Sequence, residues 1–151
     1  MRLLSGPRWA FLRYFGVAAD RRRSGIGLRF WQLLTESVVD LGWPARIALE
    51  AEDPAEAAGD PAEQEVRRGR IGFWAKCGAS ALPVPGYAMP ALTKIGSAEQ
   101  MVLMAFDPAA GSPGVADVSD LVQAIFTEHY GLAPRHPIVS AALASIGTGG
   151  G

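Results

Sequence analysis

The sequence predicts one α/β domain with a mixed β-sheet, whose two central strands run parallel and are flanked by helices. Strand, helix and strand patterns follow one another at 8–17, 26–41 and 46–51. A right-handed crossover through one helix makes the two strands parallel. The chain has 151 residues, of which 19% are charged. That length and composition are typical of a single globular domain with one core.

The strand pattern at 8–17 is rich in aromatic and β-branched side chains, and both of its faces are apolar. Such a strand is usually covered on both sides and paired on both edges. The residues that follow supply a neighbour for one edge, so we expect the other edge to be open. An open apolar edge favours association, here as a homodimer. One face carries Trp9, Phe11, Phe15 and Val17, and the other Ala10, Leu12 and Tyr14.

The helix pattern at 26–41 has the i, i+3, i+4, i+7 spacing of one buried face. Gly42 ends this helix and Pro44 prevents it from resuming. The strand at 46–51 follows. The predicted buried stripe consists of Gly27, Phe30, Trp31, Leu34, Val38 and Leu41.

A second helix is predicted after a polar loop at 53–60. Asp60, Pro61 and Glu63 have the types expected at an N-cap, a first helical position and a first-turn acid. The helix should end near Cys77, with Gly78 as its C-cap.

The remaining patterns complete the sheet and add helices. We expect strands at 81–84 and 100–106, an extended segment at 86–92, a linker at 109–114, a helix capped by Asp117 that ends near Gly131, and a last helix at 138–146 before a disordered glycine tail. This organisation divides the chain into a sheet-bearing part, 1–110, and a helical C-terminal extension, 111–151.

Composition excludes several classes of function. A net charge of −1 argues against a nucleic-acid partner, which requires a basic surplus. One cysteine, Cys77, and two histidines supply a metal site poorly, so no metal is expected. No apolar run approaches the roughly 20 residues that span a bilayer, so no membrane partner is expected. A cytoplasmic location fits these features.

The segment between the first strand and the first helix has the residues of an anion-binding loop. Arg22, Arg23 and Ser24 are followed by Gly25 and Gly27 at the start of the helix. The first N–H groups of a helix have no partners within it, and the helix dipole adds positive potential there. Glycines let a phosphate approach these N–H groups.

Three kinds of phosphate loop compete for this segment. A Walker A loop requires a lysine that is absent here, and a dinucleotide loop requires a third glycine where Phe30 stands. The third kind, Arg/Gln-x-x-Gly-x-Gly/Ala, binds acyl-CoA and matches residues 22–27. A tight turn with no ligand remains the alternative if the loop is judged by itself.

With its context, the loop resembles that of the GNAT superfamily of N-acetyltransferases. The resemblance covers residues 9–106 and includes the strand end Phe15-Gly16-Val17, the aromatic pair Phe73-Trp74 and the pair Gly78-Ala79. Residues 84–92 also resemble a Val-Pro-x-Tyr-x-x-Pro-x-Leu segment of some bacterial members. The resemblance implies a GNAT-like sheet with splayed parallel strands that lacks the first strands of the family, because the chain enters the pattern near the fourth strand.

The resemblance further implies that acetyl-CoA is the co-substrate and that an amine attacks it directly. The pyrophosphate would lie on residues 23–28, the pantetheine arm would run along 15–17, and the N–H of Val17 would stabilise the oxyanion. The residues expected to contact acetyl-CoA are Phe15, Gly16, Val17, Arg22, Arg23, Ser24, Gly25, Ile26, Gly27, Leu28 and Trp74. The acceptor amine is not specified.

Catalytic residues are less well defined. Glu50 and Glu52 close the second strand and are candidates for the base, although each could be a solvated strand-end acid. The family's acid is a tyrosine where this chain has Trp74, so Tyr87, or else Tyr14, is the candidate substitute. His129 and His136 are interpreted as structural or exposed. The alternative function is a catalytically impaired CoA-binding or interaction module, a fragment of a longer enzyme.

Overall fold

Two parallel strands, β2 (Trp9–Leu12) and β3 (Ile47–Glu52), form the centre of the protein. They are paired from Ala10 opposite Ile47 to Leu12 opposite Leu49, as the crossover through one helix predicts. The computed structural model describes residues 1–91, 97–109 and 114–147. The other strands are β1 (Arg2–Leu4), β4 (Ser80–Ala81), β5 (Ala88–Pro90) and β6 (Ala98–Phe106), in the order β1-β2-β3-β6-β4 with β5 also paired to β6.

The outer edge of β2 is covered by β1, so the predicted open edge is wrong. The two strands form an antiparallel hairpin in which Arg2 lies opposite Phe11 and Leu4 opposite Trp9. Leu4 is fully buried, which explains why this short N-terminal segment folds back onto the sheet. The homodimer through this edge stays a prediction, with β1 as the outer strand.

The strand predicted at 8–17 is shorter than expected. Pairing stops at Leu12, and residues 13–18 continue without belonging to a strand. The strand predicted at 81–84 is the two-residue β4, and the extended segment at 86–92 contains β5; its last residue lies outside the described part. The strand predicted at 100–106 is confirmed and begins two residues earlier.

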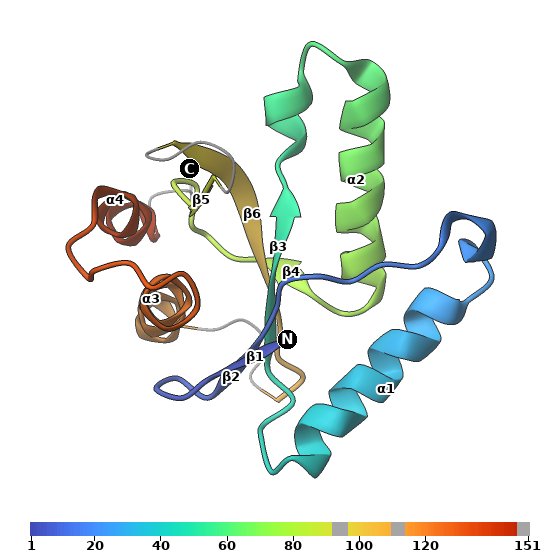
Figure 1. Ribbon diagram of the computed structural model, residues 1–151, viewed down its shortest axis with the longest axis horizontal. Coiled ribbons are helices and arrows are strands. Elements are labelled where there is room, and N and C mark those ends of the chain that lie inside the picture. Colours follow the sequence, from blue (N-terminus) through green and yellow to red (C-terminus); the bar gives the residue numbers. More distant parts are fainter. Residues whose placement is uncertain (92–96, 110–113, 148–151) are drawn as a thin grey trace.

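Helices cover both faces of the sheet (Figure 1). On one face lie α1 (Ile26–Asp40) and α2 (Pro61–Lys76). On the other lie α3 (Val115–Ala124), the π-helix Ile125–His129 and α4 (Pro137–Ser145). The helical part of 111–151 shares one core with the sheet, because Phe126 and Val139 belong to the same buried cluster as Phe11.

The start of α3 differs from the prediction. Gly114 is the N-cap and Asp117 lies inside the first turn, where its charge is favourable to the helix dipole. The core of the predicted linker, 110–113, and most of the predicted glycine tail, 148–151, lie outside the described residues.

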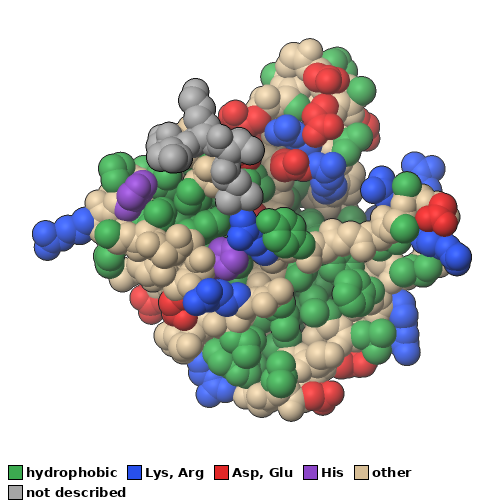
Figure 2. All heavy atoms as spheres, viewed as in Figure 1, with side chains coloured by type: hydrophobic (Ala, Val, Ile, Leu, Met, Phe, Trp, Pro, Cys, Tyr) green, Lys and Arg blue, Asp and Glu red, His purple; other side chains and the backbone are tan. Residues whose placement is uncertain are grey.

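The predicted bounds of α1 are confirmed to within one residue, but its predicted buried stripe is only partly right. Trp31 and Val38 are buried and Leu34 is half-buried, whereas Phe30 is 46% exposed and Leu41 is 62% exposed. In Figure 1, α1 leans away from the sheet, so only a narrow face of the helix contacts the core. Hydrophobic side chains consequently appear on the surface in this part of Figure 2.

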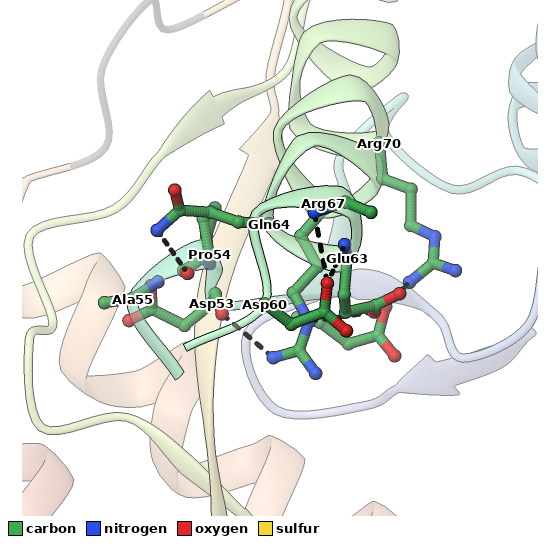
Figure 3. A network of polar contacts seen from close by, with 10 residues as sticks. Asp53, Pro54, Ala55, Asp60, Glu63, Gln64, Arg67 and Arg70 are labelled. Atoms are coloured by element: carbon green, nitrogen blue, oxygen red, sulfur yellow. Dashed lines mark hydrogen bonds and ion pairs between the residues drawn. The ribbon is translucent and has the colours of Figure 1, made fainter. Parts of the chain in front are cut away.

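Helix α2 is fixed to the end of β3 by a network of polar contacts (Figure 3). The Asp60 carboxylate accepts hydrogen bonds from the N–H groups of Ala62 and Glu63, both at 3.1 Å, which confirms it as the N-cap. Arg67 donates to the backbone oxygen of Asp53 at 3.0 Å. The predicted loop at 53–60 also contains a short 3-10 turn, Pro54–Ala57.

Candidate functional site

A cleft opens where β2 and β3 separate. Beyond Leu12 the chain leaves the sheet, while β3 continues to Glu52 in antiparallel pairing with β6. The cleft has a volume of about 880 Å³, which lies within the range of small-molecule sites. Its walls come from residues 12–17, from residues 49–52, from the inner side of α2 and from the β5–β6 hairpin.

One end of the cleft is basic and leads to the N-terminus of α1. Arg22 and Arg23 line the cleft, and Figure 2 shows basic side chains gathered over this segment at the right-hand end of the molecule. The Nε atom of Arg22 donates to the backbone oxygen of Val17 at 3.2 Å. The hydroxyl of Ser24 donates to the backbone oxygen of Arg21 at 2.5 Å. The loop is therefore held to the strand end by its own side chains.

The first turn of α1 presents backbone N–H groups that no side chain in the described part of the chain caps. Gly25 is the N-cap with φ of 82°, and no side chain of the described residues caps the helix. The first helical hydrogen bond joins the N–H of Arg29 to the oxygen of Gly25. The N–H groups of Ile26, Gly27 and Leu28 precede it, which is the arrangement that binds anions at helix starts.

The two glycines of the loop have different roles. A Cβ at Gly25 would meet no described atom within 4 Å, and its positive φ favours glycine. A Cβ at Gly27 would lie 3.1 Å from the ring of Phe73 and 3.6 Å from Cγ2 of Val17. Gly27 makes room for Phe73, while its N–H stays in the first turn. The expectation that both glycines let a phosphate approach stays a prediction.

Aromatic rings form the wall of the cleft beside this helix start. The ring of Phe15 lies edge-on to Trp74 with centroids 5.1 Å apart, and it stacks on Phe30 at 5.0 Å. Trp74 also contacts Trp31 at 5.5 Å. Trp74 therefore supplies an apolar surface along the expected path of the pantetheine arm.

A carboxylate held by two tyrosines lies at the other end of the cleft. Tyr87 is fully buried and donates its hydroxyl to Oε1 of Glu50 at 2.5 Å. The hydroxyl of Tyr130, in the turn after the π-helix, donates to Oε2 of the same carboxylate at 2.7 Å. Glu50 lines the cleft, so the two tyrosines fix the direction of this side chain.

Burial sets the protonation of this trio. It raises the pKa of Glu50, although the two tyrosine hydrogen bonds and the charge of Arg13 act in the opposite direction. Burial and the neighbouring carboxylate raise the pKa of Tyr87 and of Tyr130 well above the usual value. Both phenols thus keep their protons, and Glu50 is the group of the trio that can accept one. Tyr87, the predicted acid, is not among the residues that line the cleft, and its hydroxyl donates to Glu50, which does line it.

The other candidate residues have separate partners. Glu52 lines the cleft and forms an ion pair with Arg70 of α2. Tyr14 is 74% exposed. His129 packs against the rings of Phe11 and Tyr130, each at 4.8 Å, and burial lowers its pKa. His136 accepts the N–H of Ile138 at the start of α4. These placements agree with structural roles for the histidines.

Sequence reasoning missed two residues of this site. Arg13 places its guanidinium 5.0 Å from the ring centroid of Tyr14 and 5.8 Å from that of Tyr130. A charged residue within an apolar strand pattern was the sequence feature that could have indicated it. Tyr130 gave no signal, because it is 80 residues from Glu50 in the chain.

Neither a metal-binding group nor a membrane-spanning helix is found among the described residues. No group of three His, Cys, Asp or Glu side chains there could hold a metal ion. No helix in the same part of the chain has the length and apolar character that crossing a membrane requires.

The fold resembles that of a solved protein. The structure matches that of a protein from Bacteroides thetaiotaomicron assigned to the GNAT family of acetyltransferases, with a TM-score of 0.63 and 21% sequence identity. The match covers 83% of this chain and 62% of that protein. No family model matches the sequence, and no curated protein matches it. The protein thus has the GNAT fold, and the resemblance seen in the sequence is confirmed at the level of the fold.

Proposed function

We propose that the protein binds acetyl-CoA in the cleft between β2 and β3 and transfers the acetyl group to an amine. One observation carries this proposal. The cleft between the separated parallel strands ends at a helix start that is flanked by Arg22 and Arg23 and that no side chain of residues 1–91, 97–109 or 114–147 caps. A long ligand with an anionic group at one end and an apolar arm at the other fits this arrangement.

The residues present fit the parts of acetyl-CoA. The N–H groups of Ile26, Gly27 and Leu28, with the two arginines, would hold the pyrophosphate. The rings of Phe15 and Trp74 would contact the pantetheine arm. Residues 13–18 lie outside the sheet ladder, and the N–H of Val17 would donate to the thioester oxygen. When bound, acetyl-CoA supplies an activated acyl group.

Glu50 is proposed to receive the proton of the acceptor amine. The amine nitrogen attacks the carbonyl carbon, a C–N bond forms and the C–S bond breaks; the nitrogen loses a proton and the departing thiolate takes one up. Each oxygen of Glu50 accepts one tyrosine hydrogen bond and has capacity for another. The pKa of Glu50, raised by burial, is better matched to this role than that of an exposed carboxylate.

A second candidate function is CoA binding without turnover. Trp74 favours it, because an indole has no proton to give near neutral pH. The hydroxyls of Tyr87 and Tyr130 are both directed at Glu50, so neither replaces the missing tyrosine directly. Cytoplasmic location and the absence of nucleic-acid and membrane partners remain predictions of the sequence.

Two measurements distinguish these functions. Acetyl-CoA at 100 times its dissociation constant should raise the free energy of unfolding by about 2.7 kcal/mol. Release of free CoA thiol in the presence of an amine should then report transfer. Stabilisation with amine-dependent thiol release supports the enzyme, and stabilisation alone supports the binding module. If acetyl-CoA causes neither stabilisation nor thiol release, the proposal is contradicted.

A further inference from the structure

The two central strands separate where Arg13 and Glu50 would be the next pair. The parallel ladder ends with Leu12 opposite Leu49, and one further step would place Arg13 opposite Glu50. Both residues line the cleft. The point at which the cleft opens therefore has a cation on one strand and a carboxylate on the other.

The side chains of these two residues lie on the same face of the sheet. Residues two apart in a strand share a face, so Glu50 shares that of Ala48. Arg13 extends the chain beyond Phe11, and both Phe11 and Ala48 belong to the core cluster that includes the C-terminal helices. The contacts of Tyr130 agree with this placement. Its hydroxyl donates to Glu50, and its ring centroid is 5.8 Å from the guanidinium of Arg13.

The guanidinium of Arg13 is positioned by aromatic rings, but its N–H groups are not used. It is half-buried and lies over the ring of Tyr14 at 5.0 Å, with the ring of Tyr130 nearby. Such contacts involve the flat side of a guanidinium and leave the N–H groups at its edge free. Among residues 1–91, 97–109 and 114–147, Arg13 forms no hydrogen bond and no ion pair, and Glu50 is not an exception.

The other cations of the cleft have contacts or a place of their own. Arg70 pairs with Glu52. Arg22 and Arg23 lie at the end that meets α1, where the pyrophosphate of the acyl donor is proposed to bind. Four arginines and three glutamates line the cleft, so its lining does not exclude a second anionic group. Arg13 is the arginine of this lining that is left to bind one.

We propose that Arg13 binds a carboxylate of the acceptor and that the acceptor is an α-amino acid. This inference rests on the proposed function and names its substrate class. The N–H groups of a guanidinium match the two oxygens of a carboxylate. Glu50, on the neighbouring strand, would face the nitrogen of the same molecule.

The spacing of the two strands favours a short zwitterion. Neighbouring strands lie about 4.8 Å apart, so Arg13 and Glu50 begin from backbone positions separated by roughly one strand spacing. In an α-amino acid one carbon separates the nitrogen from the carboxylate. A molecule with a long spacer between the two groups would carry its carboxylate past Arg13 when its nitrogen is at Glu50.

Pairs of ligands that differ only by the carboxylate test the proposal. L-Phenylalanine is compared with phenethylamine, L-leucine with 3-methylbutylamine, and, as the long-spacer control, 6-aminohexanoate with pentylamine. Each ligand is titrated calorimetrically into protein saturated with CoA, where no transfer occurs, and is then assayed with acetyl-CoA. We expect both α-amino acids to bind at least about tenfold more tightly than their amines and to react with at least about tenfold higher kcat/KM, the lower end of what hydrogen bonds to charged groups contribute. 6-Aminohexanoate should show no such gain over pentylamine.

Variants of Arg13 locate the effect. Arg13→Gln should remove the preference for an α-amino acid over its amine, because an amide has neither the charge nor the paired N–H groups. Both ligands of a pair meet Glu50, so their ratio is insensitive to any effect of the variant on that residue. Arg13→Lys keeps the charge and should keep part of the preference. Arg135→Gln, at an exposed arginine outside the cleft, should leave the preference intact, and acetyl-CoA affinity should stay the same in all three variants.

The outcomes separate the two proposals. If acetyl-CoA binds but the α-amino acids bind and react no better than their amines, or do not bind at all, the inference about the acceptor is wrong and the CoA site stands. A preference that survives Arg13→Gln also contradicts the inference, since the carboxylate would then bind elsewhere. If acetyl-CoA does not bind to the folded protein, the proposed function itself fails.

Discussion

The hydroxyl of Tyr130 donates to Oε2 of Glu50 at 2.7 Å, although 80 residues separate them in the chain. Tyr130 follows the π-helix of the C-terminal region, and Glu50 lies on β3 at the cleft. The hydroxyl of Tyr87 donates a hydrogen bond to the other oxygen of the same carboxylate. The helical C-terminal region therefore contributes to the geometry and the proton affinity of the residue that we assign as the base.

Removing the hydroxyl of Tyr130 should raise the pKa of Glu50 further. The hydrogen bond stabilises the ionised carboxylate and so acts to lower its pKa. In Tyr130→Phe, the acidic limb of the pH profile of kcat/KM should move to higher pH, and a carboxyl titration by NMR should show the same shift without need of activity. Tyr14→Phe, at an exposed tyrosine outside this trio, should leave both profiles unchanged. An unchanged Glu50 titration in Tyr130→Phe would contradict the assignment.

Replacing Glu50 by glutamine should remove the acidic limb. An amide cannot take up the proton, and loss of a general base costs about 10²- to 10⁴-fold in rate. The measurement is kcat between pH 5 and 9, roughly the range in which a raised carboxyl pKa is visible. Acetyl-CoA affinity serves as the internal control and should stay the same. A variant with wild-type rate would exclude Glu50 as the base.

The same residue should make stability depend on pH. Because the pKa of Glu50 is raised above 4.5 in the folded protein, the folded state binds this proton more strongly than the unfolded state. The contribution of Glu50 to the free energy of unfolding is fully present at a pH below its pKa in the unfolded state. It is lost as the pH rises through its pKa in the folded state. The free energy of unfolding should therefore decrease over this pH range, and it should decrease less in Glu50→Gln than in the wild type. Parallel curves for the two proteins would show that the pKa is not raised.

Gly27 should be intolerant of a side chain for a reason of packing. Its Cβ would lie 3.1 Å from the Phe73 ring, and overpacking of this kind costs about 1–3 kcal/mol. Gly27→Ala should lower the free energy of unfolding in urea, and adding Phe73→Leu should recover part of the loss. Gly72→Ala is the matched control, because a Cβ there meets no described atom within 4 Å; it should stabilise α2 by about 0.5–1 kcal/mol. Equal effects at the two glycines would contradict the packing role.

The cap of α2 offers a prediction that is independent of function. Asp60→Ala removes the acceptor of two N–H groups and should cost about 1 kcal/mol in the free energy of unfolding. Asp60→Asn keeps an acceptor and should cost little. The account of this helix start would be wrong if alanine and asparagine behaved alike.

Features with local signals were predictable from the sequence. Asp60, Pro61 and Gly78 marked α2 because capping is specified by neighbouring residues. The loop before α1 was visible because arginines and glycines stand together at a strand end. The roles of Gly25 and Gly27 could not be told apart, since only the folded structure shows which one faces Phe73.

Features that depend on distant contacts were missed. The pairing of β1 with β2 covers an edge that we predicted to be open, because a three-residue strand has little pattern of its own. The exposure of Phe30 and Leu41 depends on the tilt of α1, which periodicity does not report. Tyr130 joins Glu50 through the packing of the C-terminal helices onto the sheet. Each of these relationships is set by tertiary structure.

The most direct test of the central claim is calorimetric titration of acetyl-CoA into the wild type and into Arg22→Gln with Arg23→Gly. Arg23 has φ of 63°, a conformation that glycine adopts readily, so the variant loses charge without added strain. Arg135→Gln, at an exposed arginine outside the cleft, is the control. We predict binding by the wild type and the control, and affinity at least about tenfold weaker in the double variant, since contacts to charged groups contribute about 1.5–3 kcal/mol each. Equal affinity in all three proteins, or no binding by the folded wild type, would contradict the assignment of this loop as the acetyl-CoA site.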